Sequence, residues 1–134
     1  LGVRETRHFV GVKRLTHETM YAPETKREAV AQSAYNIDIH SGVKDHIDLT
    51  PVAEPFGIPY GCLVPESLNG LLLSGRTISV DTQVFASARV MGPCIAVGEA
   101  AGTAAAMSVD KGIELRDVDV DALRATLREN GNLF

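Results

Sequence analysis

The stretch that most constrains the fold is RVMGPCIAVGEAAGTAAAMSV, residues 89 to 109. It predicts a helix built almost entirely from Ala and Gly, which is unusual because larger side chains would bury more apolar area. Pro suits the first helical position and Gly is accepted as an N-cap. We therefore expect the helix to begin with Gly92 as its N-cap and Pro93 as its first residue.

Two glycines within this helix, Gly98 and Gly102, are four residues apart, and Cys94 and Ala106 extend the same stripe. A stripe without bulky side chains allows either another backbone or a flat ligand to approach closely. Tight packing of the helix on a sheet is sufficient to explain the two glycines, and ligand approach is the alternative.

The same run is long enough to cross a membrane, but Glu99 lies at its centre and Ala and Gly contribute little transfer free energy. A buried helix of a globular protein is therefore favoured. The 134 residues, 45% of them hydrophobic with a mean hydropathy of +0.04, are typical of one globular domain.

Charge and cysteine content exclude several classes of partner. A net charge of −4 and a pI of about 5.5, without any run of Lys or Arg, argue against nucleic acid and anionic membranes. The two cysteines form no CxxC or metal-ligand spacing, which indicates a reducing cytosol. Residues 1–9 carry charges where a signal peptide needs an apolar run. We expect a cytoplasmic protein.

Hydrophobic periodicity and turn residues predict a mixed α/β fold. We expect a strand over residues 8–15, a turn at Thr16, a helical pattern over 23–34 opened by Pro23, a strand over 35–40, a loop or domain boundary over 41–57, an extended edge-like segment over 58–65, a turn at 69–70 and a buried strand over 71–74. A last helix, capped by Asp119 or Asp121, carries Val120, Leu123 and Leu127 and ends at Asn130-Gly131.

Several separated motifs occur together in one order. SGRTIS at 74–79 is followed by SARVMGPCIAVGEAAGTAAA at 87–106, and RETRHFVGVKRLT, YNIDIH and IPYGCLVPESLNGLLLSGR precede them. This combination resembles the C-terminal end of a family of FAD-dependent oxidoreductases with the glutathione-reductase-like flavoprotein fold. Two features depart from that family: the chain has no GxGxxG fingerprint, and Glu28 stands where Asp is expected. Members are several times longer, so the chain resembles their C-terminal portion.

The resemblance implies a division of the chain and a place for the cofactor. Residues 1–56 would be a substrate-domain segment and residues 57–134 the closing part of a FAD-binding domain. Gly75 and Arg76 would lie near the ribityl or pyrophosphate portion of FAD. The helix entrance at Val90, Met91 and Gly92 would direct its positive end at the pyrimidine edge of the flavin, which stabilises the reduced form.

Candidate catalytic residues lie near this entrance and on the strand at 35–40. Asp38 and His40 are two residues apart, hence on one face of a strand, where an aspartate can orient a histidine for proton transfer. A structural, hydrogen-bonded histidine is the alternative. Arg89 stands just ahead of the helix entrance and completes the set. The implied activity is two-electron (hydride) oxidation of a small organic substrate, with FAD as the carrier.

The remaining charged residues carry weaker signals. Arg4 and Arg7 flank a strand start and suit either solvent or a substrate carboxylate. His8, His17 and His46 have no metal spacing, so we expect them on the surface and expect no metal site.

Two other functions compete with a flavoenzyme. Cys94 near a helix N-terminus would have a lowered thiol pKa and act as a nucleophile with His40 as its base, although its apolar neighbours indicate a packed cysteine. Alternatively, the chain is a non-catalytic module that self-associates or binds a partner through exposed sheet edges. Because the fingerprint is absent, we expect this chain alone to bind FAD weakly or not at all.

Overall fold

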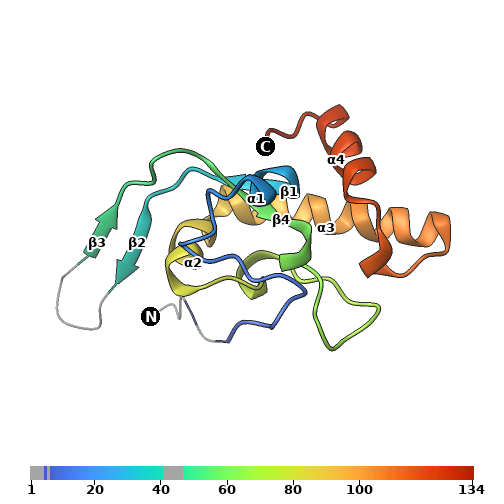
Figure 1. Cartoon of the computed structure of the whole chain (residues 1–134), viewed down its shortest axis with the longest axis horizontal. Helices are drawn as coiled ribbons and strands as arrows, with labels where there is room; N and C mark the ends of the chain where they lie inside the picture. Colours follow the sequence, from blue (N-terminus) through green and yellow to red (C-terminus); the bar gives the residue numbers. More distant parts are fainter. Residues whose placement is uncertain (1–4, 6, 41–46) are drawn as a thin grey trace.

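The chain has a mixed α+β fold, as the sequence predicts, with two small antiparallel sheets and four α-helices in the part that the structure describes (Figure 1). The structure is a computed structural model that describes residues 5, 7–40 and 47–134; Arg4 and His46 lie outside these residues. The elements are α1 (Pro23–Arg27), β1 (Ala29–Ser33), β2 (Ile37–His40), β3 (Ile47–Thr50), β4 (Phe56–Pro59), α2 (Thr82–Ala88), α3 (Met91–Lys111) and α4 (Val120–Glu129), with short 3-10 turns at Tyr60–Cys62, Gly75–Thr77 and Leu115–Asp117.

The two sheets are separate, two-stranded antiparallel pairs. β1 pairs with β4, and β2 pairs with β3 in a register that places His40 opposite Ile47. The β2–β3 pair extends away from the body of the molecule, whereas β1 and β4 lie between α3 and α1 (Figure 1). β2 contacts α2, and this contact brings the two predicted catalytic segments together.

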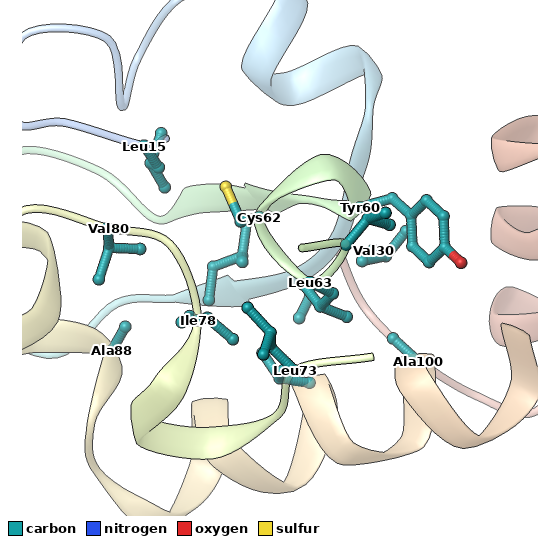
Figure 2. Packing of buried hydrophobic residues seen from close by; sticks show 14 of the residues in the cluster. Leu15, Val30, Tyr60, Cys62, Leu63, Leu73, Ile78, Val80, Ala88 and Ala100 are labelled. Atoms are coloured by element: carbon teal, nitrogen blue, oxygen red, sulfur yellow. The ribbon is translucent and has the colours of Figure 1, made fainter. Parts of the chain in front are cut away.

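One hydrophobic cluster contains residues from both predicted segments of the chain, 1–56 and 57–134. Figure 2 shows part of it, with Ala100 projecting from α3 toward the layer that holds Tyr60 and Leu63. α3 packs against β1 and α4, and its buried residues are Pro93, Val97, Ala100, Ala104 and Ser108. These small side chains keep α3 close to β1.

The start of α3 differs from the prediction. The helix begins at Met91 with Val90 as its N-cap, because the amide of Cys94 donates to the Val90 carbonyl at 3.1 Å. Pro93 therefore lies in the first turn rather than at the first position, where its missing N–H is equally harmless. The glycine stripe is not the buried one: a Cβ at Gly98 would meet the Ser74 hydroxyl at 3.6 Å, and a Cβ at Gly102 would meet nothing within 4 Å.

The predicted strand over residues 8–15 is wrong as a regular element. The segment forms isolated bridges at Gly11 and Leu15 and donates amides to Gly61 and Ser79 on two flanking segments. Both flanking segments contain a 3-10 turn, so neither runs extended long enough to complete a ladder. The expected turn after Thr16 is present: its amide donates to the Thr19 hydroxyl at 3.2 Å.

Two further predictions fail beyond residue 22. The helical pattern over 23–34 is helical only to Arg27, because Ala29, Val30 and Ala31 are buried consecutively in β1, where pairing with β4 and packing against α3 override local propensity. The expected loop over 41–57 contains β3 and the start of β4; residues 41–46 lie outside the described part.

The predicted buried strand over residues 71–74 is also wrong. Leu71 is 41% exposed, only Leu73 is buried, and the segment pairs with no strand among the described residues. A continuous apolar run indicates a strand covered on both faces only where neighbouring strands exist. The Leu73 amide instead donates to the Leu63 carbonyl at 2.7 Å.

The last helix confirms its prediction. Asp119 is the N-cap and accepts hydrogen bonds from the amides of Asp121 and Ala122, and Leu123 and Leu127 are buried. The helix ends at Glu129 with Asn130 as its C-cap, and Gly131 follows with a φ of 95°. Among the described residues, no single helix has the length and apolar character to cross a membrane; α2 and α3 pass that test only together, as a pair bent by 94°.

Candidate functional site

The structure brings Asp38, His40 and Arg89 together. His40 Nε2 lies 3.0 Å from Asp38 Oδ1 and 3.1 Å from Oδ2, as two residues on one face of β2 allow. Arg89 Nη2 donates to the Asp38 carbonyl at 2.7 Å and lies 3.2 Å from Asp38 Oδ2. The Asp38 and Arg89 side chains are 17% and 9% exposed, so this ion pair is largely shielded from solvent.

Local hydrogen bonds fix α2 relative to β2. Asp81 caps α2 by accepting from the Val84 amide at 2.8 Å, and Arg89 is the C-cap of the same helix. The buried hydroxyls of Ser33 and Ser87 lie 2.9 Å apart, and Ser87 also donates to the Tyr35 carbonyl at 2.5 Å. These contacts tie the end of α2 to the chain between β1 and β2, and so hold Arg89 beside Asp38.

A cavity of about 320 Å³ opens beside these residues, and we call it the histidine cavity. Its lining consists of Glu5, Asp38, Ile39, His40, Thr82, Ala86 and Arg89. Residues from both predicted segments of the chain therefore form its walls.

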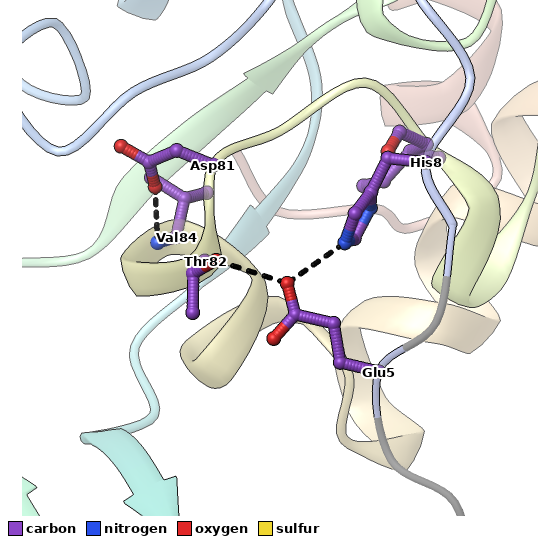
Figure 3. Close-up of polar contacts among 6 residues, drawn as sticks. Glu5, His8, Asp81, Thr82 and Val84 are labelled. Carbon is purple, nitrogen blue, oxygen red and sulfur yellow. Dashed lines mark hydrogen bonds and ion pairs between the residues drawn. The ribbon is translucent and has the colours of Figure 1, made fainter.

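Glu5, Thr82 and His8 form one wall of this region and were missed by sequence reasoning. Glu5 Oε1 lies 3.0 Å from His8 Nε2 and accepts from the Thr82 hydroxyl at 3.0 Å (Figure 3). His8 is not the surface residue that we expected: its side chain is 20% exposed and its ring meets Phe85 edge-on, with centroids 4.8 Å apart. The only sequence signal was the spacing of three residues between Glu5 and His8, whereas Thr82 is 77 residues away.

A second cavity of about 340 Å³ lies at the entrance of α3, and we call it the helix-entrance cavity. Its lining is Asp38, Arg76, Arg89, Val90 and Met91. This cavity therefore brings three predicted cofactor-binding residues, Arg76, Val90 and Met91, together with the predicted catalytic residues Asp38 and Arg89. Asp38 and Arg89 line both cavities, so their ion pair forms a common wall.

The other two predicted cofactor-binding residues lie outside that lining. Gly75 begins a 3-10 turn with a φ of 61°, and a Cβ there would come within 4.0 Å of Cys94 Sγ. Gly92 is exposed in the first turn of α3, with open space where a side chain would be. The amides of Met91 and Gly92 precede the first intrahelical hydrogen bond of α3, so they are donors at the positive end of the helix.

The geometry disfavours Cys94 as a nucleophile. Burial raises the pKa of the Cys94 thiol, against a smaller lowering by Arg76, and its Sγ faces the carbonyls of Ala88 and Arg89. The hydrogen bonds of Cys94 among the described residues do not include His40, the expected base. A thiol held protonated at neutral pH suits packing better than attack.

The remaining candidates do not join the site. Arg7 and His17 are exposed. No group of three or more His, Cys, Asp or Glu residues in the described part of the chain is arranged to hold a metal ion.

No curated protein and no solved structure was found to match the chain. The sequence model of the FAD dependent oxidoreductase family matches residues 1–127, which include every residue that lines either cavity. Because the match extends over nearly the whole sequence, the chain belongs to the FAD dependent oxidoreductase family.

Proposed function

We propose that this chain takes part in the FAD-dependent, two-electron oxidation of a small organic substrate. The observation that carries the proposal is the common wall of Asp38 and Arg89 between the helix-entrance cavity and the histidine cavity. In this arrangement the flavin edge would bind at the helix entrance and the substrate in the histidine cavity. Residues 1–56 would contribute the substrate side and residues 57–134 the FAD side.

The residues at the helix entrance suit an electron-rich ring edge. Arg76 and the positive end of α3 favour negative charge there, whereas the charge of Arg89 is paired with Asp38 in the same wall. FAD, when bound, supplies the acceptor for the hydride that leaves the substrate. The chain's own contribution is then to stabilise negative charge at this entrance and to accept the accompanying proton.

His40 is the residue placed to accept that proton. With Nε2–H directed at the Asp38 carboxylate, the neutral ring carries its lone pair on Nδ1. A substrate hydroxyl or amine in the histidine cavity would lose its proton to Nδ1, and Asp38 would stabilise the imidazolium that forms. The alternative, in which the Asp38–His40 pair only stabilises β2, predicts no loss of oxidation when His40 is replaced.

Binding of flavin can be tested with the chain itself by following backbone amide shifts during titration with FAD, riboflavin or ADP. We expect FAD and riboflavin, but not ADP, to shift the amides of residues 90–92 and Arg76. We also expect no saturation at low micromolar FAD, because micromolar affinity needs about 8 kcal/mol and a helix N-terminus contributes about 0.3–1 kcal/mol. The fingerprint that normally holds the pyrophosphate is absent from the sequence.

A matched pair of variants completes the test. Arg76→Gln should reduce the riboflavin shifts, whereas Arg14→Gln, which removes an exposed arginine from the segment before α1, should leave them unchanged. Shifts at residues 90–92 with ADP but not riboflavin would contradict the flavin-edge assignment. Saturable binding at low micromolar FAD would contradict the expected weakness of this chain alone.

A further inference from the structure

We propose that the Glu5–Thr82 wall of the histidine cavity, supported by His8, binds hydroxyl groups of an uncharged substrate. The proposal rests on the proposed function only in taking the histidine cavity as the substrate site. It assigns a binding role to Glu5 and a positioning role to His8.

Glu5 has one oxygen held and one available. His8 Nε2 and the Thr82 hydroxyl both contact Oε1 at 3.0 Å, and Oε2 has no hydrogen bond among the described residues. The second oxygen points away from both partners (Figure 3). Because Glu5 also lines the cavity, Oε2 is an acceptor for a ligand there.

His8 is held in place from three sides. Its Nδ1 lies 3.4 Å from the Ile78 carbonyl, its Nε2 faces Glu5, and its ring meets the Phe85 ring edge-on. A ring N–H at Nε2 donates to Glu5 Oε1, so the Glu5 carboxylate already has a basic partner within the chain.

The carboxylate on the opposite wall of the cavity also has basic partners. The Asp38 carboxylate is bound to Arg89 and His40, so each carboxylate that lines the cavity already has a basic partner. A charged substrate would have to displace one of these partners or remain without a counter-charge, and either outcome costs binding free energy. An ammonium ion would compete with Arg89 and His8, and a carboxylate would face Glu5 and Asp38.

A hydroxyl group fits what remains. A substrate with two hydroxyl groups can donate one to Glu5 Oε2 and the other to the lone pair on Nδ1 of His40, which lines the opposite wall. Ile39 and Ala86 supply apolar surface for the carbon skeleton, and the volume of about 320 Å³ limits the cavity to a small ligand. The chemistry therefore points to a small polyhydroxylated substrate.

The test uses three sugars that share one ring and differ in charge: D-glucose, D-glucosamine and D-glucuronate. Each is titrated into the chain at pH 7, and amide shifts of the residues lining the histidine cavity are followed. We expect D-glucose to shift these amides with a Kd at least about tenfold lower than either charged sugar. Tighter binding of a charged sugar, or no shift with about 100 mM D-glucose, would overturn the proposal.

Variants distinguish a loss of binding at the Glu5–Thr82 wall from a general effect on the folded protein. Glu5→Gln should weaken D-glucose binding at least about fivefold, and Thr82→Val, which removes one donor to Oε1, should weaken it less. Glu18→Gln is the matched control, because Glu18 is an exposed glutamate outside the cavity. Unchanged D-glucose affinity in both wall variants would refute the assignment. Binding of D-glucose without the riboflavin shifts would retain this wall and reject the proposed redox function.

Discussion

The Asp38–Arg89 ion pair should contribute measurable stability, and a double-mutant cycle with Asp38→Asn and Arg89→Met isolates its contribution. Arg89→Met also removes the contact of the guanidinium with the Phe85 ring, 5.9 Å from its centroid. The cycle cancels that loss because it occurs in both backgrounds. Asp38→Asn keeps the backbone carbonyl that accepts from Arg89 Nη2 at 2.7 Å, so the coupling reports the carboxylate alone.

The expected coupling lies between two limits. Exposed ion pairs give about 0.2–1 kcal/mol, and removing one partner of a fully buried pair costs about 3–5 kcal/mol. With side chains 9% and 17% exposed and atoms 3.2 Å apart, the Asp38–Arg89 pair should couple by about 1–2 kcal/mol. Asp38→Asn alone should lower the free energy of unfolding by about 1–3 kcal/mol, since the guanidinium loses its counter-charge.

Urea unfolding of the four proteins, followed by circular dichroism, gives the coupling directly. The control cycle uses Lys26 and Glu54, whose charged atoms lie 3.0 Å apart but whose side chains are 52% and 51% exposed. That cycle should give less than about 0.5 kcal/mol. A coupling for Asp38–Arg89 no larger than the control would refute the view that shielding strengthens this pair. The Ser33–Ser87 hydroxyl contact would then be what holds α2 beside β2.

Two further predictions concern stability away from the ion pair. The free energy of unfolding should fall as pH rises above about 9, because burial raises the pKa of Cys62 from 9.0 to about 12 and that of Tyr60 from 10.0 to about 12, so the unfolded chain ionises first. At about pH 10.5, ionisation of Cys62 in the unfolded chain should lower the free energy of unfolding by about 2 kcal/mol. In urea unfolding, Cys62→Ala should therefore lose less stability between neutral pH and about pH 10.5 than the unchanged chain. An equal loss in both proteins would contradict the role of Cys62. Gly57→Ala should destabilise the chain by about 1–3 kcal/mol because its Cβ would lie 2.5 Å from that of Ala29. Gly102→Ala should stabilise the chain by about 0.5–1 kcal/mol, because the space at its Cβ is open and Ala favours a helix more than Gly does. Thermal unfolding measures both variants, and a change of stability in the same direction for Gly57→Ala and Gly102→Ala would contradict this prediction.

Local sequence patterns predicted the parts of the site that local geometry determines. The alternation of β2 places Asp38 and His40 on one face whatever surrounds them. Away from the site, the sequence restricts the N-cap of α4 to Asp119 or Asp121, and the structure has Asp119. Contacts between distant segments were not predictable in this way. The Glu5–Thr82 hydrogen bond depends on the path of residues 7–15 between two segments that each contain a turn.

The error at β1 has a similar cause. Residues 23–34 contain good helix formers and charges at helical spacing, so their local preference favours one continuous helix. In the folded chain, β1 pairs with β4 in one sheet and contacts α3 and α4. Successive side chains of an extended strand point to opposite faces, so burying Ala29, Val30 and Ala31 together requires layers over both faces. The residues that form these layers lie far from residues 23–34 in the sequence. The sequence of residues 23–34 alone therefore does not predict β1.

Contacts among the described residues explain the composition of α3 on one of its faces. Ala100 and Ala104 are buried, which accounts for small side chains on the face toward β1. The opposite face combines open space at Gly102 with Met91 82% exposed and Val109 84% exposed, although Gly costs about 1 kcal/mol in a helix relative to Ala. Met91 belongs to this face and also lines the helix-entrance cavity, so a flat group bound at that cavity would cover apolar surface that is now exposed. The histidine cavity has no comparable exposed apolar residue in its lining, which favours the proposal that the flavin binds at the entrance of α3 and the substrate beside His40.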